Sequence, residues 1–111
     1  MKTGIILYVH GARDPRWAEP FRRLRAIVEA RGEGATVALA FLEHGVPDLA
    51  EAAAVMAGDG VRSIRIVPMF FGRGGHLRDD FPRQLEKARA RVPQVGFDVT
   101  EAAGESEQTR F

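Results

Sequence analysis

With 111 residues, the chain is long enough for one domain but too short for two independent hydrophobic cores. Hydrophobic residues make up 45% of the sequence and charged residues 28%, a composition that excludes an intrinsically disordered chain. A formal net charge of +1 argues against nucleic-acid binding driven by bulk electrostatics, and the absence of cysteine excludes disulfides and thiolate metal sites.

An apolar segment rich in β-branched residues spans residues 4–9 and is followed at once by His10 and Gly11. This segment predicts a strand that is buried on both faces. Its apolar run, residues 5–9, is far shorter than the hydrophobic region of a signal peptide or a membrane span. We therefore expect a cytoplasmic protein with no membrane partner.

Residues 16–57 predict a helix, a strand and a second helix in turn. The first helix, residues 16–31, carries apolar side chains at helical spacing and is ended by glycines. The second strand covers residues 36–42, and the second helix, residues 47–57, begins with proline. The apolar stripe of the first helix consists of Trp17, Phe21, Leu24, Ile27 and Val28.

The same alternation continues toward the end of the chain. Residues 61–70 predict a third buried strand, and the glycine-rich residues 71–76 predict a loop. A third helix is expected to begin at Asp79 or Asp80 and to run to about Arg91.

Residues 95–100 are half-polar and predict a fourth strand at an edge of the sheet. The order of elements is typical of an α/β fold with a parallel sheet and helices on both faces. We expect the strand order 2-1-3-4, a flavodoxin-like half-domain with the first strand internal. One domain covers residues 1–111, with 102–111 as a poorly structured tail, and so small a core favours a dimer.

Three residues with metal-ligating side chains follow the first three strands: His10, Glu43 and His76. Each is 33 residues from the next, so they occupy equivalent places in three βα units. In open parallel sheets, ligands bind beyond the carboxyl ends of the strands, where the strand order reverses. Two imidazoles and one carboxylate suit cobalt, nickel, iron or zinc better than magnesium or calcium, and three ligands leave coordination positions open.

These three residues also have structural interpretations. A histidine after a strand is often an ordinary loop residue, and Glu43 can cap the second helix. His44 is expected to point away from Glu43 and to be exposed. The sequence alone therefore leaves a metal site and a set of loop residues as alternatives.

Further residues near the same edge are candidates for substrate binding. Met69 is expected in the core, whereas at least one of Phe70 and Phe71 faces outward by alternation and can line an apolar slot. Gly74 and Gly75 let the backbone approach a ligand closely. The arginines at this edge are either solvated or pair with carboxylates of a ligand: Arg13, Arg16, Arg73 and Arg78.

Four short motifs together resemble those of the small class II chelatases, the family of sirohydrochlorin cobaltochelatase and ferrochelatase domains. The motifs are HGARDP at 10–15, AFLE at 40–43, VPMFFGRGGH at 67–76 and DFP at 80–82. They cover the chain from the first strand to about residue 91. The combination matches the short, single-domain form of the family, although Ala12 stands where the family commonly has serine.

This resemblance implies a homodimer that binds the macrocycle in a cleft. His10 and His76 match the family histidines that bind the metal and take part in its insertion, and Glu43 matches a carboxylate that completes the site in some members. Asp80 and Pro82 match a DxP element with a structural role. The implied reaction inserts Co²⁺, Fe²⁺ or Ni²⁺ into sirohydrochlorin for cobalamin or siroheme biosynthesis, with the metal as substrate and no organic cofactor.

Two other functions remain open at this point. A non-catalytic metal or tetrapyrrole carrier would keep the same ligands, and Ala12 together with the absence of a recognisable helix after the fourth strand favours it. An unrelated phosphate-binding or receiver-like domain has the same architecture, but receivers need acidic residues where His10 stands. A hydrolase is excluded because the sequence has no G-x-S-x-G motif.

Overall fold

The computed structural model describes residues 2–11, 16, 19–31, 34–42, 45, 47–69 and 75–100, and for residues 75–79 it describes the backbone alone. Strands and helices alternate through these ranges, as the sequence predicts. The elements are β1 (Lys2–Val9), α1 (Glu19–Arg31), β2 (Thr36–Phe41), α2 (Leu49–Gly58), β3 (Val61–Pro68), α3 (Gly75–Arg91) and β4 (Gly96–Val99).

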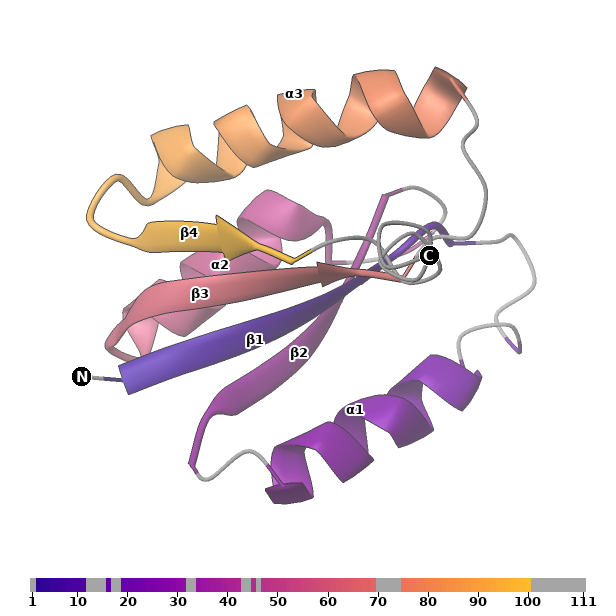
Figure 1. The fold of residues 1–111 in the computed structure, drawn as a ribbon. Helices are drawn as coiled ribbons and strands as arrows, with labels where there is room; N and C mark the ends of the chain where they lie inside the picture. Colours follow the sequence, from indigo (N-terminus) through magenta and orange to yellow (C-terminus); the bar gives the residue numbers. More distant parts are fainter. Residues whose placement is uncertain are drawn as a thin grey trace, which may run out of the picture.

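The four strands form one parallel sheet in the order β2-β1-β3-β4, so the predicted order is confirmed. β1 is internal and pairs on both sides: Ile6 lies opposite Ala38 of β2 and Ile66 of β3. The half-polar β4 is an edge strand, also as predicted. Figure 1 shows the sheet lying between α3 on one side and α1 on the other.

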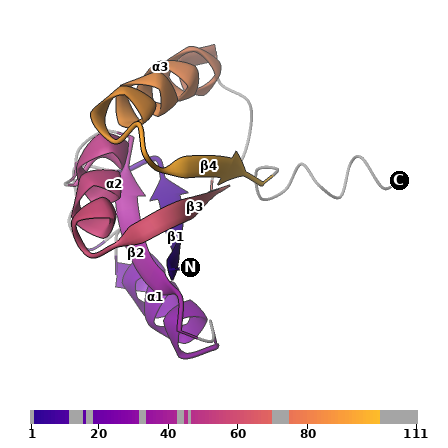
Figure 2. The ribbon, with the colours of Figure 1, turned by 90° about the vertical axis from the view of Figure 1, so that its left-hand side faces the viewer.

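The face of the sheet toward α2 and α3 carries the larger hydrophobic cluster. Side chains from alternate positions of β1 and β3 pack there against both helices. Figure 2 shows α2 and α3 next to each other, away from α1. The fully buried residues with the largest side chains in this cluster are Ile6, Tyr8, Leu49, Met56, Val61, Ile64 and Ile66.

The opposite face carries a smaller cluster beneath α1. Its buried members come from the remaining positions of β1 and β2: Leu7, Val9, Val37, Leu39 and Phe41. Phe21, Leu24 and Val28 of α1 pack against them and are only partly buried. Both faces of β1 are therefore covered, which confirms the prediction of a strand buried on both sides.

Local signals account for the ends of α2. Asp48 caps the helix, and its Oδ1 accepts a hydrogen bond from the backbone N–H of Glu51 at 2.8 Å. In return the Glu51 carboxylate accepts from the backbone N–H of Asp48 at 2.9 Å, which completes a capping box. After the helix, Gly60 has φ 95°, a conformation that lets the chain turn sharply into β3 and that favours glycine.

Two predictions about the helices are wrong. α3 begins at Gly75 rather than at Asp79 or Asp80, so Pro82 lies inside the helix instead of in its first turn. The proline removes one backbone N–H, and packing of Phe81, Leu85 and Ala88 on the core supports the helix around it. In α1, Ile27 belongs to the predicted apolar stripe but is 52% exposed.

Smaller differences concern element boundaries. α1 begins at Glu19, three residues later than predicted, and Pro20 lies in its first turn, where proline is tolerated. β3 ends at Pro68 rather than at residue 70. Trp17, His44 and the predicted tail, 102–111, lie outside the described residues. Among the helices that the structure describes, none is both long and apolar enough to cross a membrane.

Candidate active site

The carboxyl ends of the three central strands meet at one edge of the sheet. Val9, the last residue of β1, lies opposite Phe41, the last residue of β2, and Tyr8 lies opposite Pro68 at the end of β3. Two backbone hydrogen bonds extend this pairing by one residue: Leu42 N–H donates to the Val9 carbonyl at 2.9 Å, and Met69 N–H donates to the Tyr8 carbonyl at 2.7 Å. The segments that follow β1, β2 and β3 therefore leave the sheet side by side.

His10 is the first residue after β1 and lies at the centre of this edge. It is half-buried, and its Nε2 atom is shielded from solvent. Gly11 follows with φ 95°, so the chain turns directly after the histidine. The position that the sequence predicted for His10, on the internal strand where the strand order reverses, is the one that the structure gives it.

His76 is the second residue of α3, not a loop residue as predicted, because this helix begins at Gly75. It belongs to the first turn, where free backbone N–H groups and the helix dipole favour negative charge. Asp80 follows one turn later, and the two positions are four residues apart. The chain thus carries His76 on a regular element rather than on the glycine-rich segment before it.

Several predicted site residues cannot be placed around His10. Within the described ranges, no three histidine, aspartate or glutamate side chains gather into a group that could hold a metal ion. Two members of the predicted set, Glu43 and the side chain of His76, lie outside these ranges. The metal set of His10, Glu43 and His76 therefore stays a prediction. Also outside them are Arg13, Phe70, Phe71, Arg73, Gly74 and the side chain of Arg78, and of Gly75 only the backbone is described.

Behind His10, on the α2 and α3 side of the sheet, lies Tyr8, which the sequence analysis did not single out. Its side chain is completely buried, and its ring packs against that of Phe81 with the ring centroids 5.4 Å apart. Burial raises the pKa of the Tyr8 hydroxyl, and the negative charges of Asp48 and Asp80 raise this pKa further. The alternation of β1 is the sequence signal that places Tyr8 on this face with Ile6.

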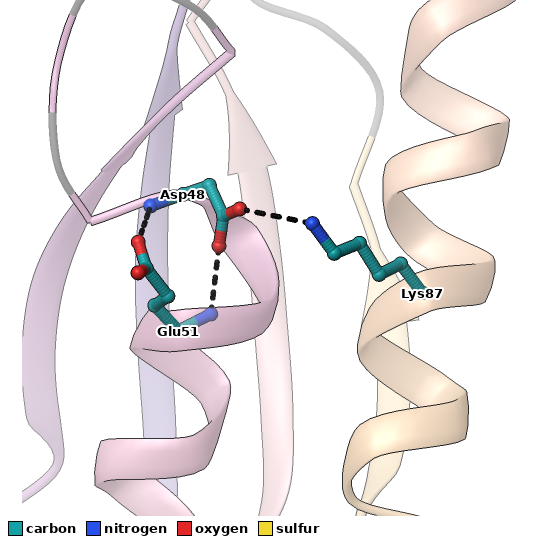
Figure 3. Close-up of polar contacts among 3 residues, drawn as sticks. All are labelled: Asp48, Glu51 and Lys87. Atoms are coloured by element: carbon teal, nitrogen blue, oxygen red, sulfur yellow. Dashed lines mark hydrogen bonds and ion pairs between the residues drawn. The ribbon is translucent and has the colours of Figure 1, made fainter.

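Asp48 connects two helices of this face (Figure 3). One oxygen of its carboxylate caps α2, and the other, Oδ2, accepts a hydrogen bond from Lys87 Nζ of α3 at 3.4 Å. On α3 itself, Asp80 accepts a hydrogen bond from Arg83 at 2.7 Å. Polar groups of β1, α2 and α3 thus lie close to the strand end that carries His10.

Comparison with known proteins assigns the chain to a family. The model of the CbiX family matches residues 4–110, nearly the whole sequence. The chain belongs to the CbiX family. The predicted family, the small class II sirohydrochlorin chelatases in their short form, is therefore confirmed, and with it the chelatase class of enzyme.

Curated relatives support this membership. A sirohydrochlorin cobaltochelatase of Sulfurisphaera tokodaii is 30% identical over 86 residues, which are 78% of this chain and 70% of that protein. The sirohydrochlorin cobaltochelatase of Methanopyrus kandleri is 33% identical over 83 residues, 75% of this chain and 58% of that protein. The matches thus span 70% and 58% of the length of these two relatives.

Solved structures show the same fold. The crystal structure of a CbiX protein from Marinobacter aquaeolei has a TM-score of 0.77 at 32% identity, and the match covers 97% of this chain and 88% of that one. SirB from Bacillus subtilis, solved with Fe³⁺, has a TM-score of 0.83 at 21% identity, and the match covers 98% of this chain but only 43% of SirB. This CbiX chain therefore has the fold of about half of SirB.

Proposed function

We propose that this CbiX chain inserts a divalent metal into sirohydrochlorin, with Co²⁺ or Fe²⁺ as the first metals to test and Ni²⁺ as the third. The observation that carries the proposal is the family match over residues 4–110, in a fold that puts His10 at the switch point of the sheet. Two curated CbiX relatives named sirohydrochlorin cobaltochelatase support Co²⁺. The metal is a substrate here, and we propose no organic cofactor.

In this proposal His10 and His76 bind the incoming metal and Glu43 completes the set. Metal insertion requires the loss of two pyrrole protons from the macrocycle, and an imidazole can serve both as a metal ligand and as a proton acceptor in neutral solution. Three protein ligands leave coordination positions open, so the ion can pass to the pyrrole nitrogens, whereas a closed four-ligand site would retain it.

The macrocycle is proposed to bind over the same edge of the sheet. Sirohydrochlorin carries several carboxylates, which suit the guanidinium group of Arg13. Phe70 and Phe71 supply apolar surface for the ring, and Gly74 and Gly75 allow the backbone to approach it. The position of Gly75 at the first turn of α3 supports this assignment, because free backbone N–H groups at a helix start also favour anions.

We further propose that two copies form a homodimer that works in the cytoplasm. The match to 43% of SirB supports the dimer, because two such chains together would be about as long as one SirB chain. The weak coverage of the sheet by α1 supports it as well, since small domains commonly complete their buried surface by association.

A metal-insertion assay tests the function. Purified protein is mixed with sirohydrochlorin and Co²⁺, Fe²⁺ or Ni²⁺, and the change in the absorption spectrum of the macrocycle is followed. We expect a metal-stimulated rate with multiple turnovers, and a loss of about 100-fold or more in His10→Ala and in His76→Ala. Wild-type rates in both variants would contradict the proposed site, and stoichiometric binding without turnover would identify a carrier instead.

A further inference from the structure

Three polar residues stand behind the proposed metal ligands, one in each of the three βα units. Tyr8 lies two residues before His10, Asp48 lies five residues after Glu43, and Asp80 lies four residues after His76. None of them belongs to the ligand set proposed above. All three lie on the side of the sheet that α2 and α3 cover.

Tyr8 is the centre of this group. Its side chain is 0% exposed within the larger hydrophobic cluster, and its ring packs at 5.4 Å on Phe81, the residue next to Asp80 on α3. The negative charges of Asp48 and Asp80 both act on the Tyr8 hydroxyl. This hydroxyl lies beneath the strand end that carries His10 and can donate or accept a hydrogen bond.

Asp48 links the two helices around Tyr8, and Asp80 is held on one of them. Both oxygens of Asp48 are engaged: Oδ1 with the backbone N–H of Glu51 at 2.8 Å, and Oδ2 with Lys87 of α3 at 3.4 Å (Figure 3). Asp80 is braced by Arg83 at 2.7 Å one turn later on the same helix. These contacts link the start of α2 to α3, and the ring contact links α3 to β1.

The three elements thus joined are those that carry or follow the proposed ligands. His10 comes directly after β1, His76 lies in the first turn of α3, and Glu43 lies between β2 and α2. A shift of one of these elements by about 1 Å would move a ligand away from the metal and can cost about 100-fold in rate. The proposed site therefore depends on how β1, α2 and α3 are held relative to one another.

We propose that Tyr8, Asp48 and Asp80 are positioning residues for metal insertion, which fix the end of β1 and the first turn of α3 at the spacing that the metal and macrocycle require. The inference rests on the proposed function, since it concerns the geometry of that same site. None of the three is proposed to touch the metal or the macrocycle. Lys87 contributes through its bond to Asp48.

Substitutions that keep the shape of each side chain test the proposal. Tyr8→Phe removes only the hydroxyl and keeps the ring on Phe81; Asp80→Asn and Lys87→Met remove charge. Asp98→Asn is the matched control, because it breaks another ion pair between elements, Arg65–Asp98 at 2.9 Å on the edge strand β4. For each variant we would measure kcat, the KM for sirohydrochlorin, the Kd for Co²⁺, the visible spectrum of bound Co²⁺ and the thermal midpoint.

We expect Tyr8→Phe and Asp80→Asn each to lower kcat or to weaken Co²⁺ binding by about 10-fold, the usual effect of groups that orient metal ligands. The spectrum of bound Co²⁺ should change. The variant with both substitutions should lose less kcat or Co²⁺ affinity than the product of the two single losses, because both residues are proposed to fix the same arrangement of β1 and α3. Lys87→Met should show a smaller loss of the same kind, and Asp98→Asn should match the wild type in every measurement except a small change in thermal midpoint.

Unchanged kcat, Co²⁺ binding and Co²⁺ spectrum in Tyr8→Phe and Asp80→Asn would overturn the inference, even if their thermal midpoints fell, because the residues would then stabilise the fold alone. Equal losses in Asp98→Asn would overturn it as well. Different results would contradict the proposed function itself. These are no metal insertion by the wild-type protein, or full activity in His10→Ala and His76→Ala.

Discussion

The two faces of the sheet are packed to different degrees. On one face, α2 buries five residues completely or nearly so: Leu49, Ala50, Ala52, Ala53 and Met56. On the other face, α1 is longer, yet none of its residues is fully buried. Its inward side chains, Phe21, Leu24 and Val28, remain partly exposed.

The sheet beside α1 is correspondingly open. A hollow there is lined mainly by residues whose positions on β1, β3 and β4 face α1: Thr3, Ile5, Ser63, Arg65 and Asp98. Four of these residues have polar side chains. On the opposite side, in the described part of the chain, no polar or charged residue is fully buried apart from the hydroxyl-bearing Tyr8. The face covered by α2 and α3 is thus the more closely packed one, which fits the positioning role that we propose for it, while α1 covers its own face less completely.

The largest expected effect comes from one chemical change made in both helices. Leu49→Ala on α2 removes a completely buried side chain and should lower the free energy of unfolding by about 3 kcal/mol. Leu24→Ala on α1 removes a half-buried one and should lower it by about 1 kcal/mol, because less apolar surface returns to water. Urea unfolding of both variants measures the difference, and equal losses would show that the two faces are packed alike.

The same contrast explains which parts of the fold could be predicted from the sequence. Residues 4–9 and 36–42 form short, nearly continuous apolar segments, and such segments predict buried strands. The order of the strands was then predicted from the rules of chain topology. The start of α3 could not be predicted, because Pro82 favours a first-turn position by local rules and only the packing of Phe81 and Leu85 overrides them. The exposure of Ile27 likewise depends on how completely α1 covers the sheet.

The positions of the candidate site residues in the fold were predicted in part, for a related reason. The position of His10 could be predicted because a residue directly after this internal strand lies where the strand order reverses, whatever conformation the following loop adopts. His76 was assigned to the right edge but to the wrong kind of element, since the beginning of α3 was missed. Tyr8 and Asp48, which we propose as positioning residues, do not stand out in the sequence, because a tyrosine in an apolar strand and an aspartate before a helix both have ordinary structural roles.

Removing a polar contact on either face should change the free energy of unfolding less. Asp48→Ala removes both the cap of α2 and the bond to Lys87, and should lower the free energy of unfolding by about 1 kcal/mol. Asp48→Asn should keep most of the stabilisation that Asp48 provides, because asparagine caps helices equally well. On α1, Glu29→Ala breaks an exposed pair with Arg25 at 3.0 Å and should cost at most about 0.5 kcal/mol. A Glu29→Ala loss as large as that of Asp48→Ala would contradict the comparison.

The smallest effect is expected where the two helices face solvent. Ile27 of α1 is 52% exposed and Val55 of α2 is 67% exposed. Replacing either with alanine removes a β-branched residue from a helix surface, which should leave the free energy of unfolding within about 0.5 kcal/mol and tends toward a slight gain. The two helices would then differ in what they bury and not in what they expose. If Ile27→Ala instead destabilised the protein by more than Val55→Ala, and if this difference grew with protein concentration, Ile27 would be covered in solution by a second copy of the chain.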